Sequence, residues 1–147
     1  MIIPLLLGIG LIITTLITQA LFLEFGQSIL QRFGNQILGK GGWTRKATIL
    51  SLTILWMLAA LSIAIAIWAI AFFVVGAFQT FEESLYFALV SFTTLGFGDV
   101  ILEYQWRLMA GIIAANGLLL LGLNTAVLID VMARMRDGDM QTYNDNE

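Results

Sequence analysis

The chain has 147 residues, of which 59% are hydrophobic and 12% charged, and its formal net charge is −3. With a mean hydropathy of +0.91 it has too little polar surface to cover a water-soluble globule of this size, which favours the lipid bilayer as its solvent. It contains no cysteine and no histidine, which excludes disulfides and thiolate chemistry and removes the commonest metal ligand and neutral-pH general base. Metalloenzymes and hydrolases are therefore disfavoured.

Runs without a charged residue cover residues 1–23, 47–81 and 108–129. Each exceeds the roughly 20 residues that a helix needs to cross a hydrocarbon core of about 30 Å, so the sequence predicts three transmembrane helices. The second run is longer than a perpendicular crossing requires, and we expect its last residues to form a loop. The first run lacks the basic start of a signal peptide, which favours a membrane span.

The first span is predicted over residues 1–24 and is followed by a connector over residues 25–46. Apolar residues from Phe25 to Leu38 recur at helical spacing, which predicts an amphipathic helix on the inner membrane surface that ends at "GKGGW". A helix packed on its neighbours is an equally good interpretation.

The basic residues are distributed unequally between the two sides of the membrane. Only Arg107 lies on one side of the predicted spans. The other side carries Arg32, Lys40, Arg45, Lys46, Arg134 and Arg136. The positive-inside rule assigns the second side to the cytoplasm, so we expect a plasma or inner membrane protein with its amino terminus outside.

The segment over residues 79–105, after an outer helix over 47–78, combines a capped helix with a glycine motif. Thr80 and Glu83 form a capping box, which predicts a short helix from Phe81 that dips back into the membrane. The stretch "TTLGFGD" follows, and non-helical backbone at that depth is tolerated where it lines a water-filled path. Glycines one residue apart allow successive carbonyls to face one side, where they replace the water around a dehydrated cation.

The stretch "TTLGFGD" resembles the potassium-channel signature sequence, which usually has Val and Tyr where this chain has Leu95 and Phe97. The resemblance extends over residues 47–135 and includes the pore-helix aromatics Tyr86 and Phe87, an inner helix over 106–134 and its hinge-like Gly117. It implies an all-α membrane protein with the tetrameric potassium-channel pore fold. Each subunit would have three transmembrane helices, a re-entrant pore helix and a selectivity filter.

The resemblance also implies roles for individual residues. The ion-binding filter would consist of Thr94, Leu95, Gly96, Phe97 and Gly98, with K⁺ held by the carbonyls of the first four and by the Thr94 hydroxyl. Thr93 would support the filter from behind, beside Tyr86 and Phe87. Asp99 would lie at the outer mouth, either to concentrate cations or to brace the filter by hydrogen bonds. One motif per chain implies a homotetramer.

Two departures from the family pattern weaken the expected support of the filter. Phe97 lacks the hydroxyl that the usual Tyr donates to the pore-helix aromatics, and Val90 stands where some relatives carry a glutamate that pairs with the aspartate. We expect fewer lateral ties and easier inactivation. The alternatives are a weakly selective monovalent cation channel, a subunit of a potassium transporter and a non-conducting scaffold.

The inner helix has a mostly apolar face at a period of about 100° per residue. That face carries Leu118, Leu121, Gly122, Thr125, Ile129 and Met132. A gate closed by dewetting is expected at Ile129 or Met132. Asn116 and Asn124 lie off this face and should hydrogen-bond between helices, while Asp130 should pair with Arg134.

The remaining segments give fewer indications. Residues 135–147 are expected to form a short, acidic, flexible cytoplasmic tail. No span has a ladder of arginines, which disfavours a voltage sensor. We expect membrane lipids as partners, no enzymatic activity, no organic cofactor and no nucleic-acid partner, and the sequence identifies no regulatory partner. The first helix is predicted either to pack outside the pore, to clamp neighbouring subunits or to set the topology.

Overall fold

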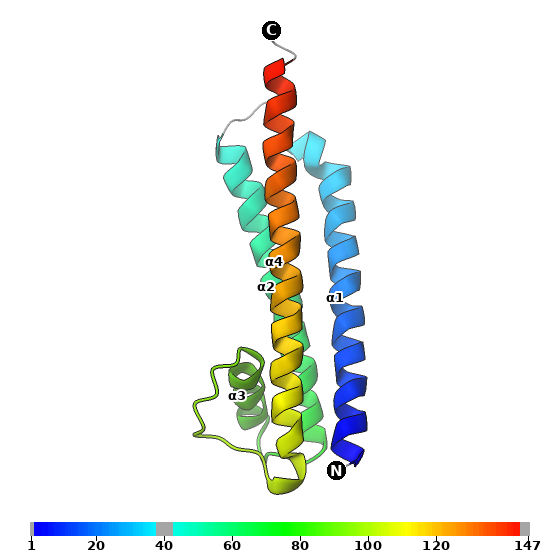
Figure 1. Cartoon of the computed structure of the whole chain (residues 1–147), viewed down its shortest axis with the longest axis vertical. Helices are drawn as coiled ribbons and strands as arrows, with labels where there is room; N and C mark the ends of the chain where they lie inside the picture. The colour runs from blue at the N-terminus through cyan, green and yellow to red at the C-terminus, as the bar shows by residue number, and fades with distance from the viewer. Residues whose placement is uncertain (1, 38–42, 145–147) are drawn as a thin grey trace.

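The computed structural model describes residues 2–37 and 43–144, all of them in helices or short connections. The elements are α1 (Ile2–Ile37), α2 (Trp43–Val74), α3 (Phe81–Phe92), the 3-10 helix η1 (Tyr104–Trp106) and α4 (Arg107–Asn144). Helices α1, α2 and α4 run side by side along the length of the molecule, and the short α3 lies at one end of the bundle (Figure 1). The all-helical fold predicted from the sequence is confirmed.

The candidate membrane spans are Ile2–Gly26, Lys46–Val74 and Tyr104–Arg136. They correspond to the three charge-free runs of the sequence, so the chain is a multi-pass membrane protein. Helix α1 begins at the end of the bundle where α3 lies, and α4 ends at the opposite end (Figure 1). This arrangement places the short helix α3 at the opposite end of the spans from the end of α1 and the start of α2 (Figure 1).

Helix α2 ends with a glycine turn before the loop that leads to α3. Gly76 has a φ of 69°, its N–H donates to the carbonyl of Phe73, and the N–H of Ala77 donates to the carbonyl of Phe72. These two bonds form a Schellman motif, which satisfies carbonyls that the helix end would leave free. The loop expected at the end of the second charge-free run therefore starts at this turn.

The core lies where α2, α3 and α4 meet. Trp68 and Phe72 of α2, Phe92 of α3, and Met109 and Ile113 of α4 are almost completely buried. Phe72 also packs edge to face against Phe87 of α3, with ring centroids 5.3 Å apart. Aromatic pairs of this geometry contribute about 0.5–1.5 kcal/mol beyond the area they bury, so they fix α3 against α2.

Two boundaries expected from the sequence differ from the structure. Helix α1 continues past residue 24 to Ile37, so the first span and the start of the connector form one helix. Gly26 lies within this helix, and its missing side chain leaves room for the Trp56 ring of α2. The flexible tail expected from residue 135 is instead helical as far as Asn144, since Met, Ala, Arg and Gln favour helix and Gly138 alone costs only about 1 kcal/mol.

Candidate functional site

Helix α3 begins at the cap that the sequence predicts. Thr80 is in an extended conformation, and its side chain accepts a hydrogen bond of 3.1 Å from the N–H of Glu83. Glu82 and Glu83 lie in the first turn, where negative charge stabilises the helix dipole. The start of the pore helix at Phe81 is therefore confirmed.

The carboxyl-terminal end of α3 is closed by the residues that follow it. The hydroxyl of Thr93 donates to the carbonyl of Leu89 at 2.8 Å, and the N–H of Thr94 donates to the carbonyl of Ser91 at 3.0 Å. The N–H of Leu95 donates to the carbonyl of Val90 at 2.9 Å. These bonds satisfy carbonyls of the last helical turn that would otherwise be unpaired, and they attach the next segment to α3. This extended, non-helical segment, residues 94–99, is called the filter strand, or simply the strand, below.

The strand after α3 alternates in backbone handedness. Positive φ angles occur at every second residue, with 61° at Thr94, 55° at Gly96 and 77° at Gly98. This is the alternation expected from the glycine spacing, and it extends to a non-glycine residue, Thr94, where it is strained. Among the residues that the structure describes, the carbonyls of Thr94 to Phe97 accept no backbone hydrogen bond. They are free to act as ligands.

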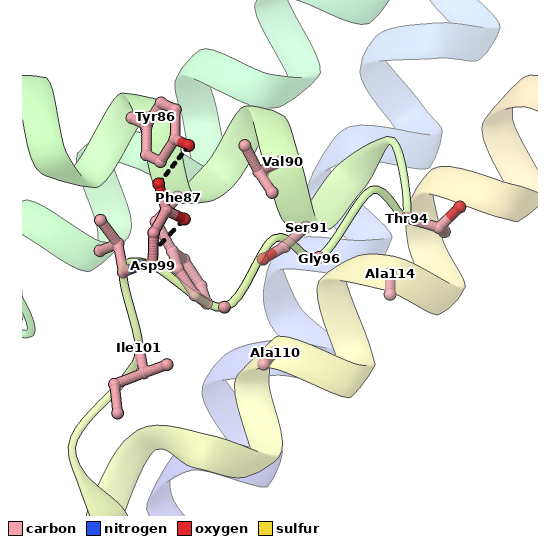
Figure 2. Close-up of a pocket in the computed structure, with 12 residues that line it drawn as sticks. Tyr86, Phe87, Val90, Ser91, Thr94, Gly96, Asp99, Ile101, Ala110 and Ala114 are labelled. Atoms are coloured by element: carbon pink, nitrogen blue, oxygen red, sulfur yellow. Dashed lines mark hydrogen bonds between the residues drawn. The ribbon is translucent and has the colours of Figure 1, made fainter.

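Asp99 is held by the pore helix. The hydroxyl of Tyr86 donates to Oδ2 of Asp99 at 2.6 Å, and the N–H of Val100 donates to Oδ1 at 3.0 Å (Figure 2). The Tyr86 bond stabilises the carboxylate and lowers the pKa of Asp99, while the same bond raises the pKa of Tyr86. Asp99 is therefore bonded to the side of α3 through Tyr86, although Val90 provides no carboxyl group to pair with it.

A pocket of about 310 Å³ lies between α3, the strand and α4. Tyr86 and Asp99 border it at one side, and Ala110 and Ala114 of α4 at another (Figure 2). Phe87 and Val90 of α3 also contribute to its lining. Because Ala110 and Ala114 have small side chains, the space between the strand and α4 is not filled by side chains of the same chain.

Gly117 is a point of close approach between α4 and the end of α3. A Cβ atom at this position would overlap the carbonyl oxygen of Phe92 and lie 2.8 Å from its carbonyl carbon. Helix α4 runs through Gly117 without interruption. The hinge expected here stays a prediction, whereas the contact explains why the position has no side chain.

The faces of α4 are separated as the sequence indicates. The exposed face includes Leu118, Leu121, Gly122, Thr125, Ile129 and Met132. Asn116 and Asn124 are buried and hydrogen-bond to Thr15 and Gln19 of α1. Contacts between helices were expected for both asparagines, but their partners were not identified. The sequence feature that could have indicated one of these partners is Gln19, the only side-chain amide in the first charge-free run.

Near the far end of α4, Nε of Arg134 lies 2.8 Å from Oδ2 of Asp130. The ion pair expected from their spacing of four residues is confirmed. Both side chains are more than half exposed, so the pair contributes little to stability.

The spans, the short helix and the alternating strand together are typical of a membrane protein built around a pore loop. The family model described as "Ion channel" matches residues 56–134, more than half of the chain. The chain therefore belongs to this ion channel family and is not an enzyme. No curated protein and no solved structure matches it. The matched region starts within α2, so α1 lies outside it.

Proposed function

We propose that the protein is a potassium-selective channel in which four copies of the chain surround one pore. The observation that carries this proposal is the alternating backbone from Thr94 to Gly98, with free carbonyls, in a stretch that resembles the potassium-channel signature. Stacked rings of such carbonyls replace the hydration shell of K⁺. One chain supplies one strand, and a ring closes around an ion only when several copies contribute.

Several neighbouring residues would support these ion sites. The negative end of the α3 dipole lies next to the strand and favours a cation there. Thr93 and the bond from Tyr86 to Asp99 hold the two ends of the strand. K⁺ would be bound by Thr94, Leu95, Gly96 and Phe97. Gly98 would complete the filter.

The exposed face of α4 would line the cavity below the filter. Leu121 and Thr125 would border the cavity, and Ile129 or Met132 would form the constriction. Gly117 would allow the helix to bend. The amino terminus would lie outside the cell and the carboxyl terminus in the cytoplasm, because most basic residues lie at the end of the spans away from α3.

The experiment is ion flux in liposomes that contain the purified full-length chain, with opposing K⁺ and Na⁺ gradients. Selective K⁺ flux is expected in the wild type. Gly96→Ala should reduce it about tenfold or more, because a left-handed alanine costs about 1–2 kcal/mol in each copy. Thr94→Ala should lower selectivity by removing a hydroxyl ligand. Asp137→Asn combined with Asp139→Asn is the matched control in the tail and should leave the flux unchanged.

The alternative function is a weakly selective monovalent cation channel, because Leu95 and Phe97 replace the Val and Tyr that are usual in the signature. Both residues are more than half exposed in the single chain, so their packing depends on the neighbouring copies. Reversal potentials in mixed K⁺ and Na⁺ solutions distinguish the two functions. A reversal potential close to that of K⁺ supports selectivity, and one between the two ions contradicts it.

A further inference from the structure

Helix α1 carries polar side chains at the middle of its membrane span. The span covers Ile2–Gly26, and its polar residues include Thr15 and Gln19, whose exposed fractions are 0% and 1%. Both are buried against α4 and do not face lipid. Polar residues at this depth are costly unless they are paired, and they commonly mark functional positions.

Each of these residues is paired with an asparagine of α4. Nδ2 of Asn116 donates to Oγ1 of Thr15 at 2.8 Å, and Nε2 of Gln19 donates to Oδ1 of Asn124 at 2.6 Å. The Thr15 hydroxyl donates to the carbonyl of Ile12 at 2.9 Å, so its oxygen remains available as an acceptor. We call the four side chains Thr15, Gln19, Asn116 and Asn124 the polar clamp.

The polar clamp holds α4 at two positions along its length, Asn116 and Asn124, and each is next to a residue that the proposed pore uses. Asn116 precedes Gly117, which packs against the carbonyl of Phe92 at the end of α3. Asn124 precedes Thr125, which belongs to the exposed face of α4. The bond between Asn116 and Thr15 therefore holds α4 next to its contact with the end of α3. The bond between Gln19 and Asn124 holds α4 next to the face that would line the proposed cavity.

The pairing within the polar clamp is incomplete. Among the described residues, Oε1 of Gln19, Oδ1 of Asn116 and Nδ2 of Asn124 have no hydrogen-bond partner. An apolar interface of the same shape would hold the two helices without these unsatisfied groups. The arrangement is therefore better suited to fixing the position of α4 than to maximal stability.

We infer that α1 sets the position of α4 through the polar clamp and thereby controls the fraction of time for which the pore is open. The four residues are positioning residues, since they act on the pore through α4 and do not contact the ions. This inference rests on the proposed function of the pore.

The test is single-channel recording of the purified full-length chain in planar bilayers. Gln19→Leu and Asn124→Leu should each change the open-to-closed equilibrium constant by about 3-fold to 20-fold for every copy in the channel, the effect of one hydrogen bond between membrane helices, so the change for the whole channel is at least about 3-fold. The double variant should change it no more than the stronger single variant, because both substitutions remove the same bond. Unitary conductance and the K⁺ to Na⁺ permeability ratio should stay unchanged.

Thr15→Val and Thr14→Val provide a matched pair on α1. The Thr14 hydroxyl is exposed and bonds only within α1, to the carbonyl of Gly10 at 2.8 Å. Thr15→Val should shift the open probability, and Thr14→Val should not. A variant that merely assembles poorly would give fewer channels with the open probability of the wild type.

The outcomes separate the inference from the function on which it rests. Wild-type current with an open probability that is unchanged in both Gln19→Leu and Thr15→Val would overturn the polar clamp alone. A wild-type chain without current would overturn the proposed function, and the control of opening with it. A shift in either direction supports the inference, and its sign identifies whether the described conformation is the open or the closed one.

Discussion

Replacement of Gly117 by alanine should separate the pore helix from the inner helix. The added methyl group would overlap the carbonyl oxygen of Phe92 and lie 3.1 Å from its Cα atom, whereas ordinary contacts begin near 3.4 Å. The obstacle is backbone and cannot rotate away, so α4 must move as a body. Overpacking of this kind costs about 1–3 kcal/mol, and the better helix propensity of alanine returns about 1 kcal/mol at most.

Thermal unfolding of the purified protein in detergent, followed by circular dichroism, measures this cost. Gly10→Ala is the control, because nothing lies within 4 Å of the added methyl group, and its stability should be unchanged or slightly higher. Liposome flux should show reduced K⁺ selectivity in Gly117→Ala, since the carbonyl of Phe92 lies directly before the filter strand. Unfolding at the wild-type temperature together with wild-type selectivity would refute the close approach. Intact folding and selectivity with rare opening would instead favour a hinge.

Three further changes test the two ends of the pore loop and the packing of α1 on α2. Tyr86→Phe removes the bond that lowers the pKa of Asp99. In the wild type this bond stabilises the protein at pH values above the ordinary Asp pKa, and the stabilisation is lost as the pH falls through the lowered pKa of Asp99. Flux against external pH should therefore fail at a higher pH in Tyr86→Phe, and coincident curves would contradict the brace. Thr80→Ala should lower the free energy of unfolding by about 1 kcal/mol through loss of the helix cap, whereas Thr80→Ser should retain it. Trp56→Phe should cost about 1 kcal/mol, because the indole N–H donates to the carbonyl of Phe22 at 2.9 Å; wild-type unfolding in this variant would show that the bond does not hold α1 to α2.

The local features of this fold were predictable from the sequence because short-range signals determine them. The three spans follow from hydropathy and length, and the start of α3 follows from Thr80 and Glu83. The backbone alternation at Gly96 and Gly98 follows from the spacing of the glycines, since few other residues adopt a positive φ. The pair of Asp130 and Arg134 follows from helical spacing.

Contacts between distant segments were not predictable in the same way. The partners of Asn116 and Asn124 lie 101 and 105 residues away in the chain, and neither periodicity nor hydropathy specifies which helices adjoin. The bond from Tyr86 to Asp99 depends on how the strand folds back along α3. Residues 25–37 were predicted to be helical but separate from the first span, and the tail from residue 135 was predicted to be flexible. Both continue the preceding helix, because a helix can leave the membrane without ending.

Helix α1 has another consequence for experiments on this channel. Only 17% of its hydrophobic window is buried within the chain, compared with 44% for the window in α2. Its tilt therefore responds to hydrophobic mismatch, the difference between its apolar length and the thickness of the surrounding bilayer. With α1 acting on the pore through α4, as inferred above, we expect channel opening to depend on acyl-chain length, and recordings should be compared only between membranes of equal thickness.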